Sequence, residues 1–72
     1  MSATQRYENT LKNLAKRVKE LRMERGWTQE EMRDHGFNYR HYQRIESGST
    51  NPTLNTLHRL AKAFKVKISD LF

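Results

Sequence analysis

The stretch that decides the fold runs from Thr28 to Gly48 and reads TQEEMRDHGFNYRHYQRIESG. It opens with a capping box, because the Thr28 hydroxyl can accept a hydrogen bond from the backbone N–H of Glu31 while the Glu31 carboxylate reaches back to Thr28. Gly36 ends the helix that begins at Thr28 after about two turns. Asn38 is a good N-cap for the next helix, which Gly48 ends. The stretch therefore predicts two short helices joined by a tight turn.

Upstream of this stretch, apolar residues recur from Tyr7 onward at the three- and four-residue spacing of an amphipathic helix. This helix is expected to end near Arg25, before Gly26. Residues 1–9 carry few apolar side chains, so the pattern fits either a frayed N-terminal segment or the start of the helix. The predicted buried stripe comprises Leu11, Leu14, Ala15, Val18 and Leu21.

Downstream, residues 48–52 form a loop of small and polar residues. A fourth helix follows, with Pro52 or Thr53 at its start. Residues 66–68 then connect to a last short turn, which Ser69 is expected to cap. The fourth helix carries on one face Leu54, Leu57, Leu60, Ala61 and Phe64.

Length and composition agree with one small all-helical domain. The chain has 72 residues, of which 35% are hydrophobic and 31% charged, and this balance suits a single compact core. It lacks cysteine, so packed helices must stabilise it without disulfides or thiolate zinc sites. We expect a compact all-α, five-helix domain over residues 10–72, with its two central helices in residues 28–48.

The net charge indicates the kind of partner. Fourteen Lys and Arg against eight Asp and Glu give a formal charge of +6, which favours a polyanionic partner. The charge also fits an anionic membrane surface, but the apolar stripe of the first helix is needed for the core. No apolar run approaches the ~20 residues of a membrane span or forms a signal peptide, so we expect a cytoplasmic protein.

The helix expected over residues 39–47 has two different sides. At about 100° per residue, Tyr42, Ile45 and Glu46 share the side that should face the core. Arg can donate two hydrogen bonds to guanine and Gln can pair with adenine, so the opposite side has chemistry that reads base edges in the major groove. That opposite side carries Arg40, Gln43, Arg44 and Ser47.

Five blocks of sequence, in order, resemble the lambda repressor and Cro-like (Xre) family of helix-turn-helix regulators over residues 14–72. The blocks are LAKRVKELR (14–22), GWTQEEM (26–32), RIESG (44–48), NPTL (51–54) and LAKAF (60–64). Five matching blocks are much more specific than any one of them. The resemblance implies a lambda-repressor-like fold and sequence-specific binding of double-stranded DNA by a transcriptional repressor or autoregulator.

The same resemblance implies roles for individual residues. Helix 39–47 would enter the major groove, and Arg22 and Glu46 match a structural ion pair that ties the first helix to the end of the third. The implied base-reading residues are Tyr39, Arg40, Gln43 and Arg44. The residues expected to contact phosphates are Thr28, Gln29, Asn38, His41, Ser47, Ser49, Thr50 and Asn51.

One departure from the family pattern lies inside the deciding stretch. Between Gln29 and Gly48 the chain is one residue shorter than the usual family spacing, and Arg33 stands where family members commonly have Ala. We expect a tighter or irregular turn over residues 32–36, with Phe37 supplying apolar surface that the shortened helix lacks. The residue of helix 39–47 that faces each base could shift accordingly.

Catalytic and metal-binding functions find little support in the sequence. His35, His41 and His58 lie on separate elements without a metal-ligand spacing. No carboxylate pair, nucleophile elbow or phosphate-cradling glycine loop is present. We therefore expect no enzyme activity, no metal and no cofactor.

The partner is expected to be a palindromic operator bound by a homodimer, in a prokaryotic or phage-encoded protein associated with the nucleoid. The alternative is a small helix-turn-helix antitoxin or adaptor whose main ligand is a protein. A carboxylate-free cationic helix face favours DNA, because protein interfaces centre on aromatic and apolar anchors. The candidate dimer contacts, which could equally close the monomer's own core, are Ile68, Leu71 and Phe72.

Overall fold

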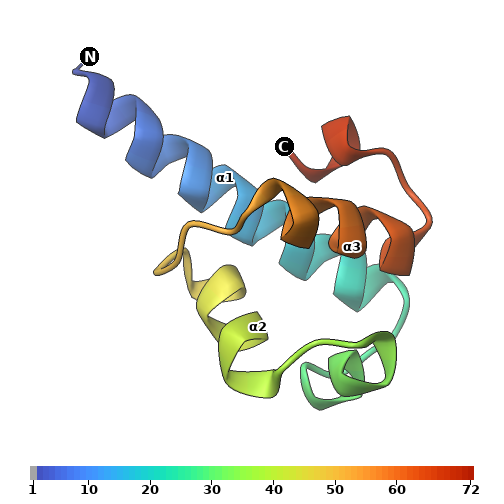
Figure 1. Ribbon diagram of the computed structural model, residues 1–72. Helices are drawn as coiled ribbons and strands as arrows, with labels where there is room; N and C mark the ends of the chain where they lie inside the picture. The colour runs from blue at the N-terminus through green and yellow to red at the C-terminus, as the bar shows by residue number, and fades with distance from the viewer. Residues whose placement is uncertain (1) are drawn as a thin grey trace.

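The computed structural model describes residues 2–72 and contains three α-helices and two 3-10 helices (Figure 1). In chain order they are α1 (Ala3–Glu24), η1 (Glu30–His35), α2 (Tyr39–Ser47), α3 (Leu54–Phe64) and η2 (Ile68–Leu71). No strand occurs within residues 2–72. The all-helical prediction is therefore confirmed, with two of the five elements wound as 3-10 helices.

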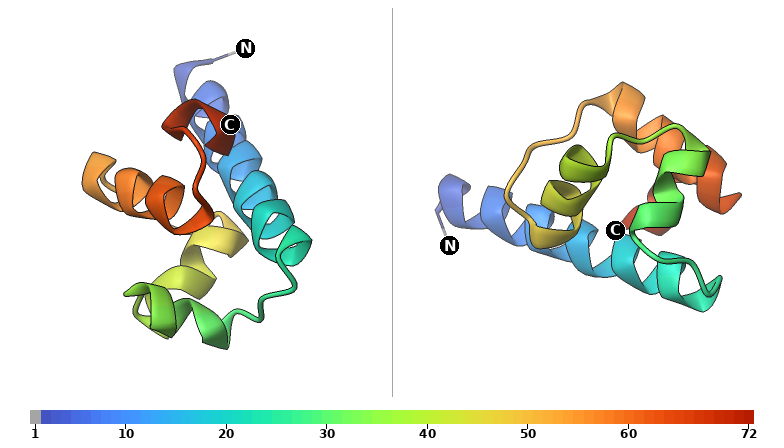
Figure 2. Two further views of the ribbon diagram at one scale, coloured as in Figure 1. Left: turned by 90° about the vertical axis from the view of Figure 1, so that its right-hand side faces the viewer. Right: turned by 90° about the horizontal axis from the view of Figure 1, so that it is seen from below.

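The first helix, α1, runs along the whole body, and its N-terminal turns project beyond the other elements (Figure 2). It begins with a capping box, in which Ser2 Oγ accepts from the N–H of Gln5 at 3.2 Å and Gln5 Oε1 accepts from the N–H of Ser2 at 2.9 Å. Residues 2–10 are all exposed, and full burial starts only at Leu14. The N-terminal segment is thus the capped start of the helix from Ala3 onward, while Met1 lies outside the described residues.

The second element, η1, is wound more tightly than an α-helix. Thr28 Oγ1 accepts from the N–H of Glu31 at 3.1 Å, but among the described residues the predicted reciprocal bond from Thr28 to Glu31 does not form, and Gln29 rather than Thr28 is the N-cap residue of η1. A 3-10 helix rises about 2.0 Å per residue against about 1.5 Å in an α-helix, so its six residues span the length of about eight α-helical ones. The irregular turn expected over residues 32–36 is therefore confirmed.

The two remaining α-helices begin at side-chain caps. Asn38 Oδ1 and Thr53 Oγ1 each accept from a backbone N–H three residues further on, both at 3.1 Å. Gly48 ends α2 in the left-handed region at φ 72°, as predicted. Lys65 ends α3 at φ 57°, a conformation that glycine adopts at less cost than a residue with a Cβ atom.

The core lies where α1, α2 and α3 meet. Phe37, in the turn before α2, is buried there with its ring centroid 5.9 Å from that of Tyr42. The apolar contribution predicted for Phe37 is therefore confirmed, and so is the burial of Tyr42. The largest fully buried side chains belong to Val18, Leu21, Met32, Tyr42, Ile45, Leu60, Phe64 and Leu71.

The prediction that Leu54 faces the core is wrong, because 72% of this residue is exposed. Leu54 is the first residue of α3, directly after the Thr53 cap. At this end of the helix the inward position belongs to Thr56, which is buried with its hydroxyl oxygen 3.1 Å from that of Thr53.

The prediction that Ser69 caps the last turn is also wrong. The residue before η2 is Lys67, whose backbone N–H donates to the Asp70 carboxylate at 2.9 Å. The same turn is closed by the N–H of Asp70, which donates to the carbonyl of Lys67 at 2.9 Å.

The C-terminal apolar residues divide between the core and the surface. Leu71 is completely buried and closes the monomer's own core, so its alternative role as a dimer contact is wrong. Ile68 packs partly buried against the same core. Phe72 is 52% exposed and is the one of the three that presents a substantial apolar surface.

Candidate nucleic-acid interface

The helix α2 turns one side to the core and the other outward. Tyr42 and Ile45 are buried, and the Glu46 side chain is only 3% exposed. The outward side therefore carries no carboxylate, and the division predicted from the helical periodicity is observed. Its exposed residues are Arg40, Gln43, Arg44 and Ser47.

The first turn of α2 is held by a side-chain cap from Asn38 and by a ring contact. The Oδ1 atom of Asn38 is used as the cap, which leaves its amide nitrogen as a donor. The Arg33 guanidinium carbon lies 5.0 Å from the centroid of the Tyr39 ring, a cation–π contact. Sequence reasoning missed this role of Arg33, which brings a positive charge next to the start of α2.

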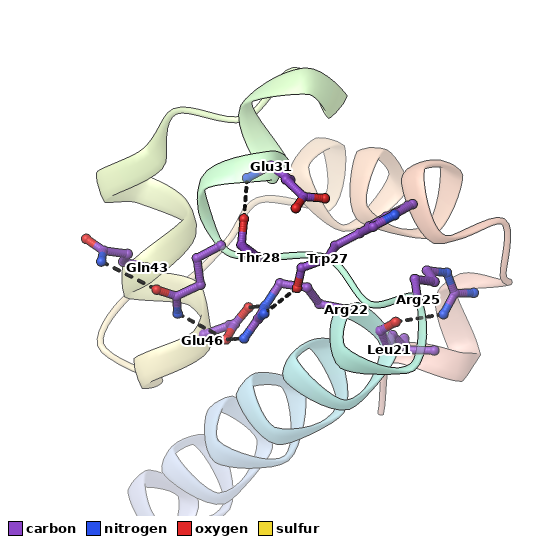
Figure 3. A network of polar contacts seen from close by, with 9 residues as sticks. Leu21, Arg22, Arg25, Trp27, Thr28, Glu31, Gln43 and Glu46 are labelled. Carbon is purple, nitrogen blue, oxygen red and sulfur yellow. Dashed lines mark hydrogen bonds and ion pairs between the residues drawn. The ribbon is translucent and has the colours of Figure 1, made fainter.

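Arg22 in α1 joins three elements through one guanidinium group (Figure 3). Its Nε and Nη2 atoms donate to the two carboxylate oxygens of Glu46 at 2.6 and 3.1 Å, and its Nη1 atom donates to the carbonyl of Trp27 at 2.6 Å. The side chains of Arg22 and Glu46 are 11% and 3% exposed. This buried bidentate pair fixes the C-terminal turn of α2 against α1.

The pair changes the protonation equilibria of its members. The hydrogen bond to Glu46 raises the pKa of Arg22 above its ordinary value. Burial by itself favours the neutral form of Glu46, but the hydrogen bonds from Arg22 and Gln29 outweigh it and lower the pKa of this carboxyl. The pair is therefore fully ionised at neutral pH.

The Tyr42 hydroxyl is a buried polar group of a different kind. No hydrogen bond of good geometry to it is found within residues 2–72, and its pKa lies above the ordinary tyrosine value, first because of burial and then because of the neighbouring Glu46 carboxylate. The phenol is therefore neutral at physiological pH, and Tyr42 acts mainly through the packing of its ring.

Gln29 links the ion pair to the exposed side of α2. Its Nε2 atom donates to Glu46 at 3.1 Å, and its Oε1 atom accepts from Nε2 of Gln43 at 3.4 Å (Figure 3). The hydroxyl of Thr28, the preceding residue, accepts from the N–H of Glu31 at the start of η1. A predicted phosphate-contacting residue and a predicted base-reading residue are thus direct neighbours, a contact that sequence reasoning did not identify.

The loop after α2 borders the other end of the helix. The Ser47 hydroxyl donates to the carbonyl of Arg44 at 3.0 Å, and its oxygen lies 2.7 Å from the hydroxyl oxygen of Ser49. The backbone N–H of Ser49 donates to the same carbonyl at 3.1 Å. Of the next two residues, Thr50 is half-buried and Asn51 is exposed.

The predicted contact residues therefore occupy three adjoining segments, namely the start of η1, the outward side of α2 and loop 49–51. His41 lies half-buried on α2. A shallow hollow of about 540 Å³ adjoins the first segment, between the end of α1, residues 26–30 and Tyr39.

The three histidines lie apart from any metal-binding arrangement. Within residues 2–72 no three histidine or carboxylate side chains gather as metal ligands would. His35 instead stacks on Trp27 with ring centroids 4.1 Å apart, and His58 is exposed on α3. In the same described part of the chain, no helix has the length and apolar character to cross a membrane.

These features define a class of protein. A capped short helix, a tight turn and an outward-facing polar helix, all fixed to a longer helix, make up the helix-turn-helix of DNA-binding regulators. The sequence profile of the helix-turn-helix family matches residues 18–71. The chain therefore belongs to the lambda repressor and Cro-like (Xre) family of DNA-binding regulators. No curated protein and no solved structure matches it.

Proposed function

We propose that this protein is a transcriptional repressor or autoregulator that occupies a palindromic operator as a homodimer. The observation that supports it most is the exposed side of α2, which bears Arg and Gln side chains without a carboxylate and is flanked at both ends by hydrogen-bond donors. The formal charge of +6 adds long-range attraction to DNA. The protein is expected to be bound to its operator in the nucleoid of a prokaryotic or phage-infected cell.

In the proposed complex α2 enters the major groove. Arg40, Gln43 and Arg44 read base edges from its exposed side, and Tyr39 does so from its first turn. Gln43 contacts its base while its side-chain amide is hydrogen-bonded to Gln29, so these two side chains are positioned together. The phosphate contacts come from Thr28, Gln29, Asn38, His41, Ser47, Ser49, Thr50 and Asn51.

A dimer is needed because α2 has only nine residues and covers a few base pairs. Two-fold related helices that lie about 34 Å apart would read two half-sites one turn of DNA apart and multiply the affinity. Since Leu71 belongs to the monomer core and Ile68 packs partly against it, Phe72 is the C-terminal residue with the most apolar surface left for an intersubunit contact.

Selection of bound DNA from a random pool tests the proposal. A two-fold symmetric consensus with half-sites about one helical turn apart is the expected result. Binding should weaken steeply as salt rises, because phosphate contacts release counterions. Recovery of unenriched sequences, or a stoichiometric protein partner in pull-downs together with no DNA shift, would favour the antitoxin or adaptor instead.

A further inference from the structure

A second cationic surface lies at the C-terminal ends of η1 and α3. Figure 1 shows these two ends on the opposite side of the ribbon from α2. This surface is a hollow of about 530 Å³, and none of the residues that line it belongs to α2 or to loop 49–51. No carboxylate is among them. The side chains that line it are those of Trp27, His35, Arg59, Lys62, Ala63 and Lys65.

Arg59 is fixed in place at this hollow. Its guanidinium carbon lies 4.8 Å from the centroid of the Phe37 ring, and its Nη2 atom donates to the carbonyl of Gly36. These contacts use one face and one donor of a group that has five N–H bonds. The remaining donors are therefore held in a defined position at low entropic cost for an anion.

Lys65 stands in a backbone conformation that disfavours lysine. Its φ is 57°, and it is the one residue other than glycine with positive φ within residues 2–72. Glycine would end α3 with less strain, as Gly48 ends α2. A strained position that keeps a long cationic side chain is typical of a residue whose side chain has a use.

The same hollow has an aromatic wall. Trp27 is stacked on His35 with ring centroids 4.1 Å apart and on Phe64 at 5.9 Å. Trp27 is half-buried between these two rings and His35 is exposed, so the ring surface that the hollow presents is that of His35, supported from behind by Trp27. Flat rings beside fixed cations are the combination that holds a base together with its phosphate.

We propose that this hollow binds a nucleotide phosphate group through Arg59, Lys62 and Lys65, and that the base of a free nucleotide lies against the exposed ring of His35. The site is separate from the operator-binding surface and does not depend on it. The phosphate could come from two sources, a free nucleotide or the backbone of DNA that flanks the operator. Only a free nucleotide can also place its base on the rings, because bases in duplex DNA are stacked inside.

Fluorescence can test the free-nucleotide source directly, because Trp27 is the only tryptophan of the chain. We expect adenosine monophosphate to change the emission of the whole protein saturably, and ribose 5-phosphate and adenosine to bind more weakly. The double variant Lys62→Ala with Lys65→Gly should weaken binding by about tenfold or more, since it removes charge-assisted contacts. Lys65→Gly suits the local backbone, so the fold is retained.

A matched control is Lys12→Ala with Lys19→Ala, which removes the same charge from the exposed side of α1. It should leave the affinity for adenosine monophosphate unchanged. If the flanking DNA backbone is the ligand, an operator with long flanks binds more tightly than a trimmed one. The Lys62→Ala, Lys65→Gly variant then loses this gain and keeps its affinity for the trimmed operator.

Absence of both the nucleotide response and the flank-dependent gain would overturn the proposal. So would a response that is equally strong in the double variant and in the wild type. The nucleotide titration uses no DNA, so its result is independent of whether an operator is found.

Discussion

The guanidinium group of Arg22 and the carboxylate of Glu46 form a bidentate contact that is almost completely shielded from water. The pair connects the C-terminal half of α1 to the last turn of α2. Because Glu46 also accepts from Gln29, one buried contact controls both the orientation of α2 and the position of a residue at the proposed DNA surface.

Arg22→Ala should lower the free energy of unfolding by roughly 3 to 5 kcal/mol, because it leaves the Glu46 carboxylate buried without its cation. Urea denaturation at neutral pH measures this loss. Glu24→Ala is the control, since Glu24 is 60% exposed in its ion pairs and should cost less than about 1 kcal/mol. Similar losses in both variants would show that burial does not distinguish the two kinds of pair.

Glu46→Gln should be destabilising at pH 7 and progressively less so as the pH falls below the ordinary glutamate range. The folded pKa of Glu46 lies below its ordinary value of about 4.3, so the ionised pair stabilises the fold above that pH. This contribution is lost as the pH falls through the folded pKa. The difference in unfolding free energy between wild type and variant, measured at several pH values, should therefore shrink in acid; a constant difference would contradict the assignment.

Asn38→Asp separates capping from phosphate contact. Aspartate caps helices about as well as asparagine, so stability should change by less than about 0.5 kcal/mol. DNA binding should weaken for all sequences alike, because a carboxylate replaces the amide donor next to the phosphates. Thermal unfolding and binding to specific and unrelated duplexes measure the two effects; unchanged DNA affinity would remove Asn38 from the contact surface.

Arg44→Ala and Gln29→Ala should change DNA binding in two different ways. Loss of Arg44 should cost roughly 1 to 3 kcal/mol of binding and relax the preference at one base position. Loss of Gln29 should weaken all sequences by a similar factor, with a secondary effect at the position that Gln43 reads, because Gln43 loses its partner. Selection experiments with each variant provide the comparison. Identical base preferences in both would contradict the division of roles.

Lys65→Gly should stabilise the fold by about 0.5 to 1 kcal/mol, because it relieves the left-handed strain at the end of α3. Gly48→Ala should destabilise by a similar amount. A Cβ atom at Gly48 would meet Ala15 only at 3.8 Å, so the cost comes from the backbone conformation rather than from a clash. Denaturant midpoints of both variants, which are expected to move in opposite directions, give the measurement.

Most features that depend on neighbouring residues in the sequence could be predicted, although the cap expected at Ser69 was wrong because Lys67 and Asp70 close the last turn. Asn38 and Gly48 bound α2 as expected, because an N-cap and a left-handed C-cap depend on chemistry within a few residues. The two sides of α2 followed from its periodicity alone. The family resemblance also extended to the buried pair of Arg22 and Glu46, which the fold brings together over 24 positions.

Features that depend on how the elements meet could not be predicted. Leu54 and Leu71 are both leucines near helix ends, yet Leu54 is exposed and Leu71 is completely buried. Only the position of η2 over the core decides this difference. The contacts of Arg33 with Tyr39 and of Gln29 with Gln43 likewise depend on the path of η1 in the folded chain, and no local sequence pattern predicts them.

The tight winding of η1 has a consequence for how this chain should be compared with its relatives. A helix that changes its pitch can lose a residue and still deliver the chain to the same point in space. If residues 29–48 are one residue shorter than the family spacing, as the resemblance implies, positions after η1 are better matched from the Gly36 turn forward than counted from the start of the motif.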